Sequence, residues 1–175
     1  MFLGLAACAW TYFQPVPMYA PATKAFTPDE FKTFRADENR KMHRLREELD
    51  ARRIFQRYGC DAALAGPTAR YAEDVGLPAR IIAADVVVES SCQEDIVSPK
   101  GAVGLMQIMP SIHHIDRRSL FDRETNLRNG SRILAEYARE RGGIREGLRG
   151  YFGVTEGSTH SDEYADRVLA VAYGR

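Results

Sequence analysis

The stretch ESSCQEDIVSPKGAVGLMQIMPS, residues 89–111, and the apolar run ARIIAADVVV directly before it, residues 79–88, decide the fold. Pro78 suits the first turn of a helix, and a helix that is apolar almost all round is normally buried. The three valines of the run also fit a strand. The preceding alanines and the Gly-Leu-Pro start favour a buried helix that ends near Ser90, followed by a segment with loop character.

Glu89 is the unusual residue of this helix, because a carboxylate that ends an apolar helix must be solvated by a cleft, paired, or kept neutral. A carboxyl group in a partly apolar site has a raised pKa and can act as a general acid, which cleavage of a glycosidic bond requires. The alternative is a helix-end glutamate that faces water. Asp85 lies one turn earlier on the same face and would raise the pKa of Glu89 if the two were close, but we expect Asp85 to be exposed at the surface.

The run GAVGLMQIM at residues 101–109 is the second unusual feature. Gly101 and Gly104 allow the backbone to approach another backbone or a ligand closely. Gln107 stands between two apolar residues and needs hydrogen-bond partners, which a sugar amide or hydroxyl would supply. The alternative is a glycine-rich turn that leads into a core helix, with Gln107 at its edge.

Taken together, Glu89-Ser90 and the run from Ser98 to Pro110 form an ordered pair of motifs. This pair resembles the SLT-type family of lytic transglycosylases in the lysozyme-like superfamily. That family shows a catalytic Glu-Ser pair and, a short distance on, Ser-x-x-Gly-Ala-x-Gly-Leu-Met-Gln-x-x-Pro. The resemblance extends over about residues 69–172, with Asn126 fitting the helix that follows the motif.

The resemblance implies a mainly α fold: a lysozyme-like helical domain with a loop-rich or small β insert after the catalytic helix. It implies an enzyme that cleaves the β-1,4 bond between N-acetylmuramic acid and N-acetylglucosamine in peptidoglycan and forms a 1,6-anhydro ring. Glu89 would be the single acid and base, first giving a proton to the glycosidic oxygen and then taking one from the C6 hydroxyl. The residues implied in binding substrate or orienting Glu89 are Ser90, Ser98, Gly104, Leu105, Met106, Gln107, Tyr151 and Tyr164.

More specific roles follow from the same resemblance. Ser90 would orient the carboxyl group, Gln107 and the Met106 backbone would hold sugar, and Tyr151 would position Glu89. Phe152 stands where the family has an asparagine, which removes one expected sugar contact but not the acid. Cys92 likewise replaces an aromatic or other large apolar residue that the family often has.

Two alternatives to a lytic transglycosylase stay open. A lysozyme-type hydrolase would cleave the same bond, with Glu94 or Asp95 activating a water. A catalytically weak glycan-binding module is the other, and Phe152 in place of the asparagine favours it.

The part of the chain before this domain carries no such resemblance. Residues 1–26 are expected to be an apolar tail and a proline-rich linker. Residues 27–60 are expected to be an N-terminal helical extension, because Thr-Pro-Asp-Glu at its start is a helix-capping sequence and apolar residues recur at helical spacing. Residues 61–175 would form the transglycosylase domain, with helices expected at 61–75 (interrupted at Gly66-Pro67), 79–90, 126–141, 144–153 and 163–173.

Charge and cysteine content limit the partners. Lys and Arg number 24 and so do Asp and Glu, giving a net charge of zero, so we expect no nucleic-acid partner. His113-His114 is interpreted as surface loop and no cluster has metal spacing, so we expect neither metal nor cofactor.

The three cysteines are either independent small residues, or Cys60 and Cys92 pair in an oxidising compartment and Cys8 is left over.

The first ten residues, MFLGLAACAW, bear on location. They lack the basic start of a secretion signal and are too short to span a bilayer. Residues 5–8, LAAC, resemble a bacterial lipoprotein signal, which would place a lipid anchor on Cys8; a frayed apolar tail is the alternative. We expect a bacterial cell-envelope location, periplasmic or associated with the outer membrane, with peptidoglycan glycan strands and an envelope or secretion-apparatus protein as partners.

Overall fold

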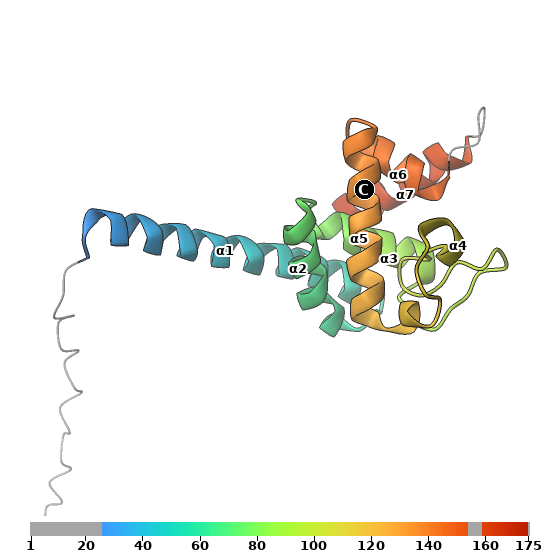
Figure 1. The fold of residues 1–175 in the computed structure, drawn as a ribbon, viewed down its shortest axis with the longest axis horizontal. Helices are drawn as coiled ribbons and strands as arrows, with labels where there is room; N and C mark the ends of the chain where they lie inside the picture. Colours follow the sequence, from blue (N-terminus) through green and yellow to red (C-terminus); the bar gives the residue numbers. More distant parts are fainter. Residues whose placement is uncertain (1–25, 154–158, 175) are drawn as a thin grey trace, which may run out of the picture. The chain divides into compact units, whose positions relative to one another are not determined.

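The computed structural model describes residues 26–153 and 159–174, and the lipid anchor expected at Cys8 lies outside them. Contacts divide the chain into two units, Met1–Asp37 and Glu38–Arg175. The domain boundary expected near residue 60 stays a prediction. Residues 38–60 belong to the second packing unit. The helices, shown in Figure 1, are α1 (Pro28–Arg57), α2 (Ala65–Val75), α3 (Ala79–Ser90), α4 (Pro110–His113), α5 (Arg123–Glu140), α6 (Ile144–Phe152) and α7 (His160–Tyr173), with short 3₁₀ turns at Ala62–Leu64 and Ser119–Phe121.

The mainly α prediction is confirmed, and the segment between α3 and α4 is the expected loop-rich insert. Its β structure consists of two isolated antiparallel bridges, Val97 with Val103 and Val103 with Ile108. Among the described residues no helix is both long and apolar enough to cross a bilayer.

Helix α1 begins as its sequence predicts. The Glu30 N–H donates to Thr27 Oγ1 at 3.3 Å and the Thr27 N–H donates to the Glu30 carboxylate at 2.8 Å, which is a capping box. Near the other end of α1, Ile54 and Phe55 are buried in the core of the second unit. The helix therefore changes from an exposed start to a packed end.

The second half of α1 also supports the start of α3. The Glu47 carboxylate accepts a hydrogen bond from the Ala79 N–H at 2.6 Å, and Asp50 forms an ion pair with Arg80. A carboxylate at a helix N-terminus pairs with otherwise unsatisfied N–H groups and with the positive end of the helix dipole. Charged residues of α1 thus fix the beginning of the helix that carries Glu89.

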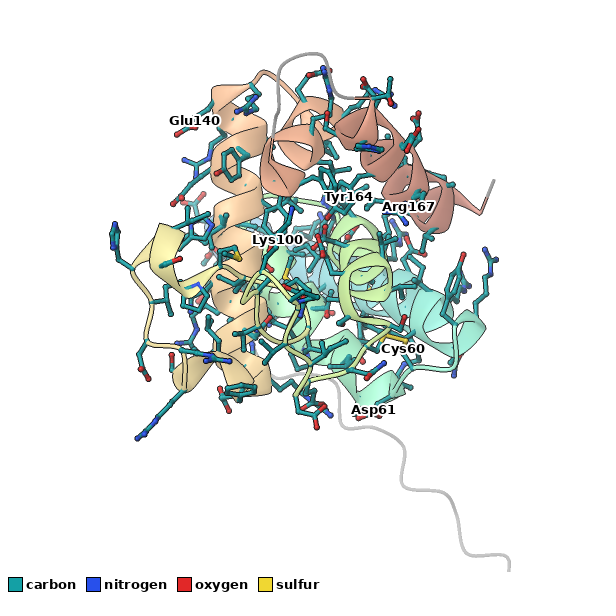
Figure 2. All side chains as sticks on the ribbon, turned by 90° about the vertical axis from the view of Figure 1, so that its right-hand side faces the viewer. Cys60, Asp61, Lys100, Glu140, Tyr164 and Arg167 are labelled. Atoms are coloured by element: carbon teal, nitrogen blue, oxygen red, sulfur yellow. A yellow bond between two sulfur atoms is a disulfide. The ribbon has the colours of Figure 1, made fainter. Side chains whose placement is uncertain are left out.

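Helix α3 lies in the core, packed against α2 and α7, while α5 packs against α2 and α6, and α6 against α7. Figure 2 shows side chains filling the space between these helices. Residues 79 and 81–86 of α3 are buried, as expected for a helix that is apolar all round. Asp85 is among them with no exposed surface, so the expectation that it lies at the surface is wrong. The reason is that α7 covers the face of α3 on which Asp85 lies.

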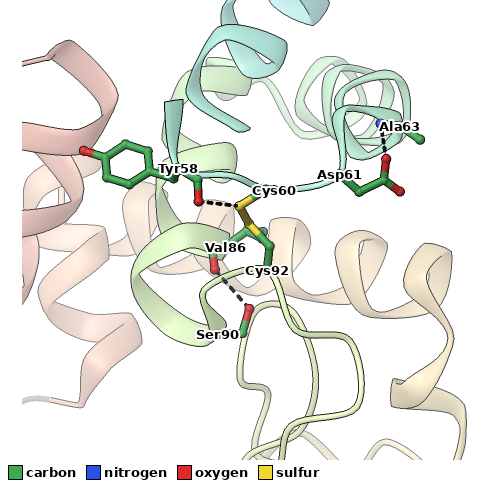
Figure 3. The surroundings of a disulfide bond; sticks show 7 residues. All are labelled: Tyr58, Cys60, Asp61, Ala63, Val86, Ser90 and Cys92. Carbon is green, nitrogen blue, oxygen red and sulfur yellow. Dashed lines mark hydrogen bonds between the residues drawn. A yellow bond between two sulfur atoms is a disulfide. The ribbon is translucent and has the colours of Figure 1, made fainter. Parts of the chain in front are cut away.

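The end of α3 is fixed by a disulfide. Ser91 and Cys92 both have positive φ angles, 50° and 65°, so the chain turns sharply after Ser90. Cys92 is bonded to Cys60, with the two Cα atoms 5.8 Å apart (Figure 3). Of the two alternatives for the cysteines, the structure therefore has the Cys60–Cys92 pair. The bond joins the segment after α1 to the loop that follows Glu89.

Some helix boundaries differ from those expected. Helix α5 begins at Arg123 rather than near Asn126, because the Asp122 carboxylate accepts from the Thr125 N–H at 2.8 Å and caps the helix earlier. Pro67 lies in the first turn of α2 and does not interrupt it; the break comes before Ala65. The single turn α4 was not expected.

Candidate active site

The candidate site is centred on Glu89, at the end of α3, where the side chain is partly buried. The hydroxyl of Tyr164, from α7, lies 2.7 Å from Glu89 Oε1 and 2.5 Å from Asp85 Oδ1. Figure 2 shows Tyr164 and Arg167 on α7, beside α3. Two carboxyl groups one helical turn apart thus share a single phenol.

The surroundings of Glu89 change its acidity. Burial raises the pKa of Glu89 to about 7, against the opposing effects of the Tyr164 hydrogen bond and the positive charge of Arg167. A carboxyl group that titrates near neutral pH can both give and take a proton under physiological conditions. The raised pKa expected from the apolar helix is therefore present at this position.

Asp85 is the more strongly affected of the two carboxyl groups. Its pKa is raised well above the ordinary range, first by complete burial and then by the nearby charge of Glu89. The sequence contained a signal for this, since Asp85 stands inside an apolar run one turn before Glu89. A helix that is apolar all round is buried, so a polar side chain on it is buried too.

Tyr151 makes a different contact from the one expected of it. Its hydroxyl donates to the Met106 carbonyl at 2.7 Å, whereas the hydroxyl that contacts Glu89 is that of Tyr164. The two tyrosines therefore have different contacts. Tyr164 bonds to the carboxyl groups, and Tyr151 connects α6 to the glycine-rich loop of residues 101–109.

Asn126 of α5 holds the other side of that loop. Its amide oxygen accepts from the Met106 N–H at 2.9 Å, and its amide nitrogen donates to the carbonyls of Val103 and Leu120 at 2.9 and 2.8 Å. A fully buried asparagine with all these partners is a strong structural constraint. The sequence predicts that Asn126 lies on this helix, but its neighbours Thr125, Arg128 and Asn129 are polar, and so nothing local signals that its amide is buried.

Residues 104–106 determine the shape of the glycine-rich loop. Gly104 has φ +75°, and a Cβ there would lie 2.3 Å from Asn126 Nδ2 and 2.7 Å from the Leu120 carbonyl, so only glycine fits. Leu105 and Met106 have no exposed surface. Both Met106 backbone groups have protein partners, and the expected sugar contact of this backbone stays a prediction.

The remaining motif residues also have protein partners. Ser90 Oγ donates to the Val86 carbonyl at 3.0 Å, within its own helix, rather than to Glu89 (Figure 3). Ser98 Oγ accepts from the Ala102 N–H at 3.0 Å. Gln107, with φ +45°, donates to the Gly104 carbonyl at 2.9 Å. These contacts shape the insert; whether Gln107 also binds sugar stays a prediction.

Phe152 lies against the site. Its ring stacks on that of Tyr164, with centroids 4.9 Å apart, and 45% of the residue is exposed. The residue that replaces the family's asparagine therefore covers the tyrosine that holds both carboxyl groups.

Other side chains could act as a base toward water or bind a metal ion, and their surroundings are as follows. Glu94 forms an ion pair with Arg123, which also lies 3.0 Å from Asp61. Over residues 26–153 and 159–174, no three histidine, cysteine or acidic side chains gather in a way that could hold a metal ion. Burial lowers the pKa of His113, which favours its neutral form.

A helical domain with a glutamate at the end of the buried helix α3, and with a glycine-rich loop held by Asn126 and Tyr151, defines a lysozyme-like fold. Residues 67–170 match the transglycosylase SLT domain family. This match covers more than half of the chain, and the chain belongs to that family.

Among solved structures, the chain is similar to the lytic transglycosylase Slt of Pseudomonas aeruginosa, determined as an inactive mutant. The two are 22% identical with a TM-score of 0.53, over 60% of this chain and 22% of that one. At this identity the likeness concerns the fold, and the chain corresponds to about a fifth of the length of Slt. A search of curated proteins found no match.

Proposed function

We propose that this chain is a peptidoglycan lytic transglycosylase, with Glu89 as its single acid and base. The observation that carries the proposal is a carboxyl group with a pKa of about 7, bonded by Tyr164, at the position of the family's catalytic Glu-Ser pair. Membership of the SLT family supports peptidoglycan as the substrate.

The reaction follows from one carboxyl group that changes state twice. Protonated Glu89 gives its proton to the glycosidic oxygen between N-acetylmuramic acid and N-acetylglucosamine, which turns that oxygen into a good leaving group. The muramic N-acetyl group assists from within the substrate. The Glu89 carboxylate then takes the proton of the C6 hydroxyl, whose oxygen bonds to C1 and closes the 1,6-anhydro ring. A pKa near 7 suits both transfers.

The residues around Glu89 support this sequence of steps. Tyr164 donates to the Glu89 carboxylate that exists between the two transfers, and Arg167 favours the same charged form. Asn126 and Tyr151 hold the loop of residues 101–109 in place, and we expect this loop to form one wall of the substrate site.

A hydrolase would need a second group to activate water. The ion pair between Glu94 and Arg123 disfavours Glu94 in that role, because its carboxylate is already engaged by another side chain. The hydrolase and the weak glycan-binding module are the outcomes against which the proposal is tested.

The test is to digest purified peptidoglycan in water enriched in ¹⁸O and to analyse the released fragments by mass spectrometry. The proposal predicts anhydromuramyl ends without ¹⁸O, because no water enters the product. Reducing ends that carry ¹⁸O would assign a hydrolase. No release, under conditions where an established lytic enzyme acts, would favour the binding module.

The location and partners belong to the same proposal. A cell-envelope location gives access to the wall, and the Cys60–Cys92 disulfide supports an oxidising compartment such as the periplasm. An envelope or secretion-apparatus protein as partner, and a lipid on Cys8, stay predictions.

A further inference from the structure

The three oxygens of the Asp85–Tyr164–Glu89 group restrict where protons can be. The Tyr164 hydroxyl oxygen is within hydrogen-bond distance of both carboxyl groups, 2.5 Å from Asp85 Oδ1 and 2.7 Å from Glu89 Oε1. A phenol carries one proton and can donate to only one of them. The second contact is a hydrogen bond only if the other carboxyl group is protonated and donates to the phenol oxygen. Two hydrogen bonds among three oxygens thus require one protonated carboxyl group.

The burial of the two groups decides which one holds that proton. Asp85 has no exposed surface, and its Oδ2 has no hydrogen-bond partner among the described residues. Glu89 is only partly buried and is acted on by the positive charge of Arg167. A buried anionic oxygen without a partner costs far more than a buried neutral carbonyl. The proton therefore belongs on Asp85.

The other titratable groups around the pair agree with this assignment. They are Tyr164 and Arg167 from α7 and Tyr151 from α6, with Tyr137 of α5 acting on Tyr151. Tyr151 and Tyr164 are neutral, since burial raises the pKa of both hydroxyl groups well above the ordinary value. Among these groups the positive charge is on Arg167, which acts on Glu89.

We propose that Asp85 is a positioning residue: it stays a neutral carboxylic acid, donates to the Tyr164 hydroxyl oxygen, and so directs the Tyr164 proton to Glu89. This inference rests on the proposed role of Glu89. The chain of two hydrogen bonds stabilises the Glu89 carboxylate between its two proton transfers, and it leaves the other oxygen of Glu89 for the substrate. Protons are conserved, because Asp85 keeps its own throughout.

The first test is the pH dependence of kcat/KM for two variants of Asp85. In Asp85→Asn the amide still donates to Tyr164, so the alkaline limb of the profile stays where it is in the wild type. In Asp85→Leu the donor is lost and the Glu89 carboxylate is less stabilised, so the limb moves up by about half a unit to one unit. In a Tyr164→Phe background, Asp85→Leu causes no further movement.

Two results would overturn the inference. A downward shift of the limb in Asp85→Asn would mean that Asp85 is an anion that raises the pKa of Glu89 by repulsion. Unchanged profiles in both variants, even at reduced activity, would mean that Asp85 has only a structural role.

The second test needs neither activity nor a folded leucine variant. In Glu89→Gln, infrared spectroscopy at neutral pH should detect the carbonyl stretch of a protonated carboxylic acid, and the band should vanish in Glu89→Gln/Asp85→Asn. If only carboxylate bands are present, Asp85 is ionised and the inference fails. Because this readout is independent of substrate, failure of the inference can be told apart from failure of the proposed function.

Discussion

Two carboxyl groups one turn apart on α3 differ in what surrounds them, and this difference sets their chemistry. Asp85 is enclosed completely, whereas Glu89 lies at the helix end, partly exposed and near Arg167. Both are bonded by the same tyrosine hydroxyl. Environments that push the pKa values of neighbouring acids apart are typical of active sites.

The pH dependence of the reaction follows from the acidity of Glu89. Its pKa is raised to about 7, and the first step needs the protonated form. We therefore expect kcat/KM for muropeptide release to fall above pH 7, by about tenfold for each further unit. Rates measured from pH 4.5 to 9 on soluble glycan fragments check this. An alkaline limb near the ordinary pKa of a glutamate would contradict the raised pKa of the catalytic acid.

Residue-level inference from sequence succeeded where a motif and a physical argument agreed. Glu89 was predicted to have a raised pKa because it ends an apolar helix, and it does. Asp85 was expected at the surface because aspartate is seldom buried, but the sequence did not reveal that Tyr164, 79 residues further on, would cover it. Which of two tyrosines contacts Glu89 likewise depends on how α6 and α7 pack.

At the scale of elements, the disulfide connects the end of α1 to the loop after α3, and Cys60 and Cys92 are 32 residues apart in sequence. Closing a loop of this length restricts the unfolded chain and is worth about 3–4 kcal/mol. We expect Cys60→Ser/Cys92→Ser to lose that much unfolding free energy in urea titrations. Cys8→Ser is the control and should change little. Equal stability of the double variant and the wild type would mean that the bond contributes nothing to the fold.

The glycine-rich loop offers a matched pair of substitutions. Gly104→Ala would push a methyl group to 2.3 Å from Asn126 Nδ2, whereas at Gly101 nothing lies within 4 Å, although both have positive φ angles. We expect Gly101→Ala to cost about 1–2 kcal/mol from backbone strain alone. Gly104→Ala should cost about 2–4 kcal/mol and also reduce activity. Thermal unfolding of both variants measures the difference, and equal costs would contradict the close packing of Asn126 against this loop.

Helices with local signals were predictable and those without were not. The capping sequence at Thr27 and the Gly-Leu-Pro before Ala79 marked the starts of α1 and α3 correctly. Pro110 is the only local signal for the single turn α4. The early start of α5 depends on the Asp122 cap, which the hydrophobic pattern does not show. Boundaries are lost where a cap, rather than hydrophobic periodicity, sets them.

At the scale of the whole molecule, the fold and family were predictable because the motif of residues 89–111 is long and ordered, and residues 67–170 match the SLT family. The contacts that tie this motif together come from distant helices: Asn126 from α5, Tyr151 from α6 and Tyr164 from α7. The family pattern predicts where these residues stand along the chain, but only the packing of the helices shows which atom each one contacts.

If Glu89 is the acid and base of the reaction, its removal must abolish product formation. This is measured as the rate at which anhydromuramyl fragments are released from peptidoglycan by the wild type, Glu89→Gln and the control Glu94→Gln, each shown to be folded. We expect a loss of about 10²–10⁴-fold in Glu89→Gln and near wild-type release of the same product by Glu94→Gln. Release by Glu89→Gln at a rate close to that of the wild type would contradict it.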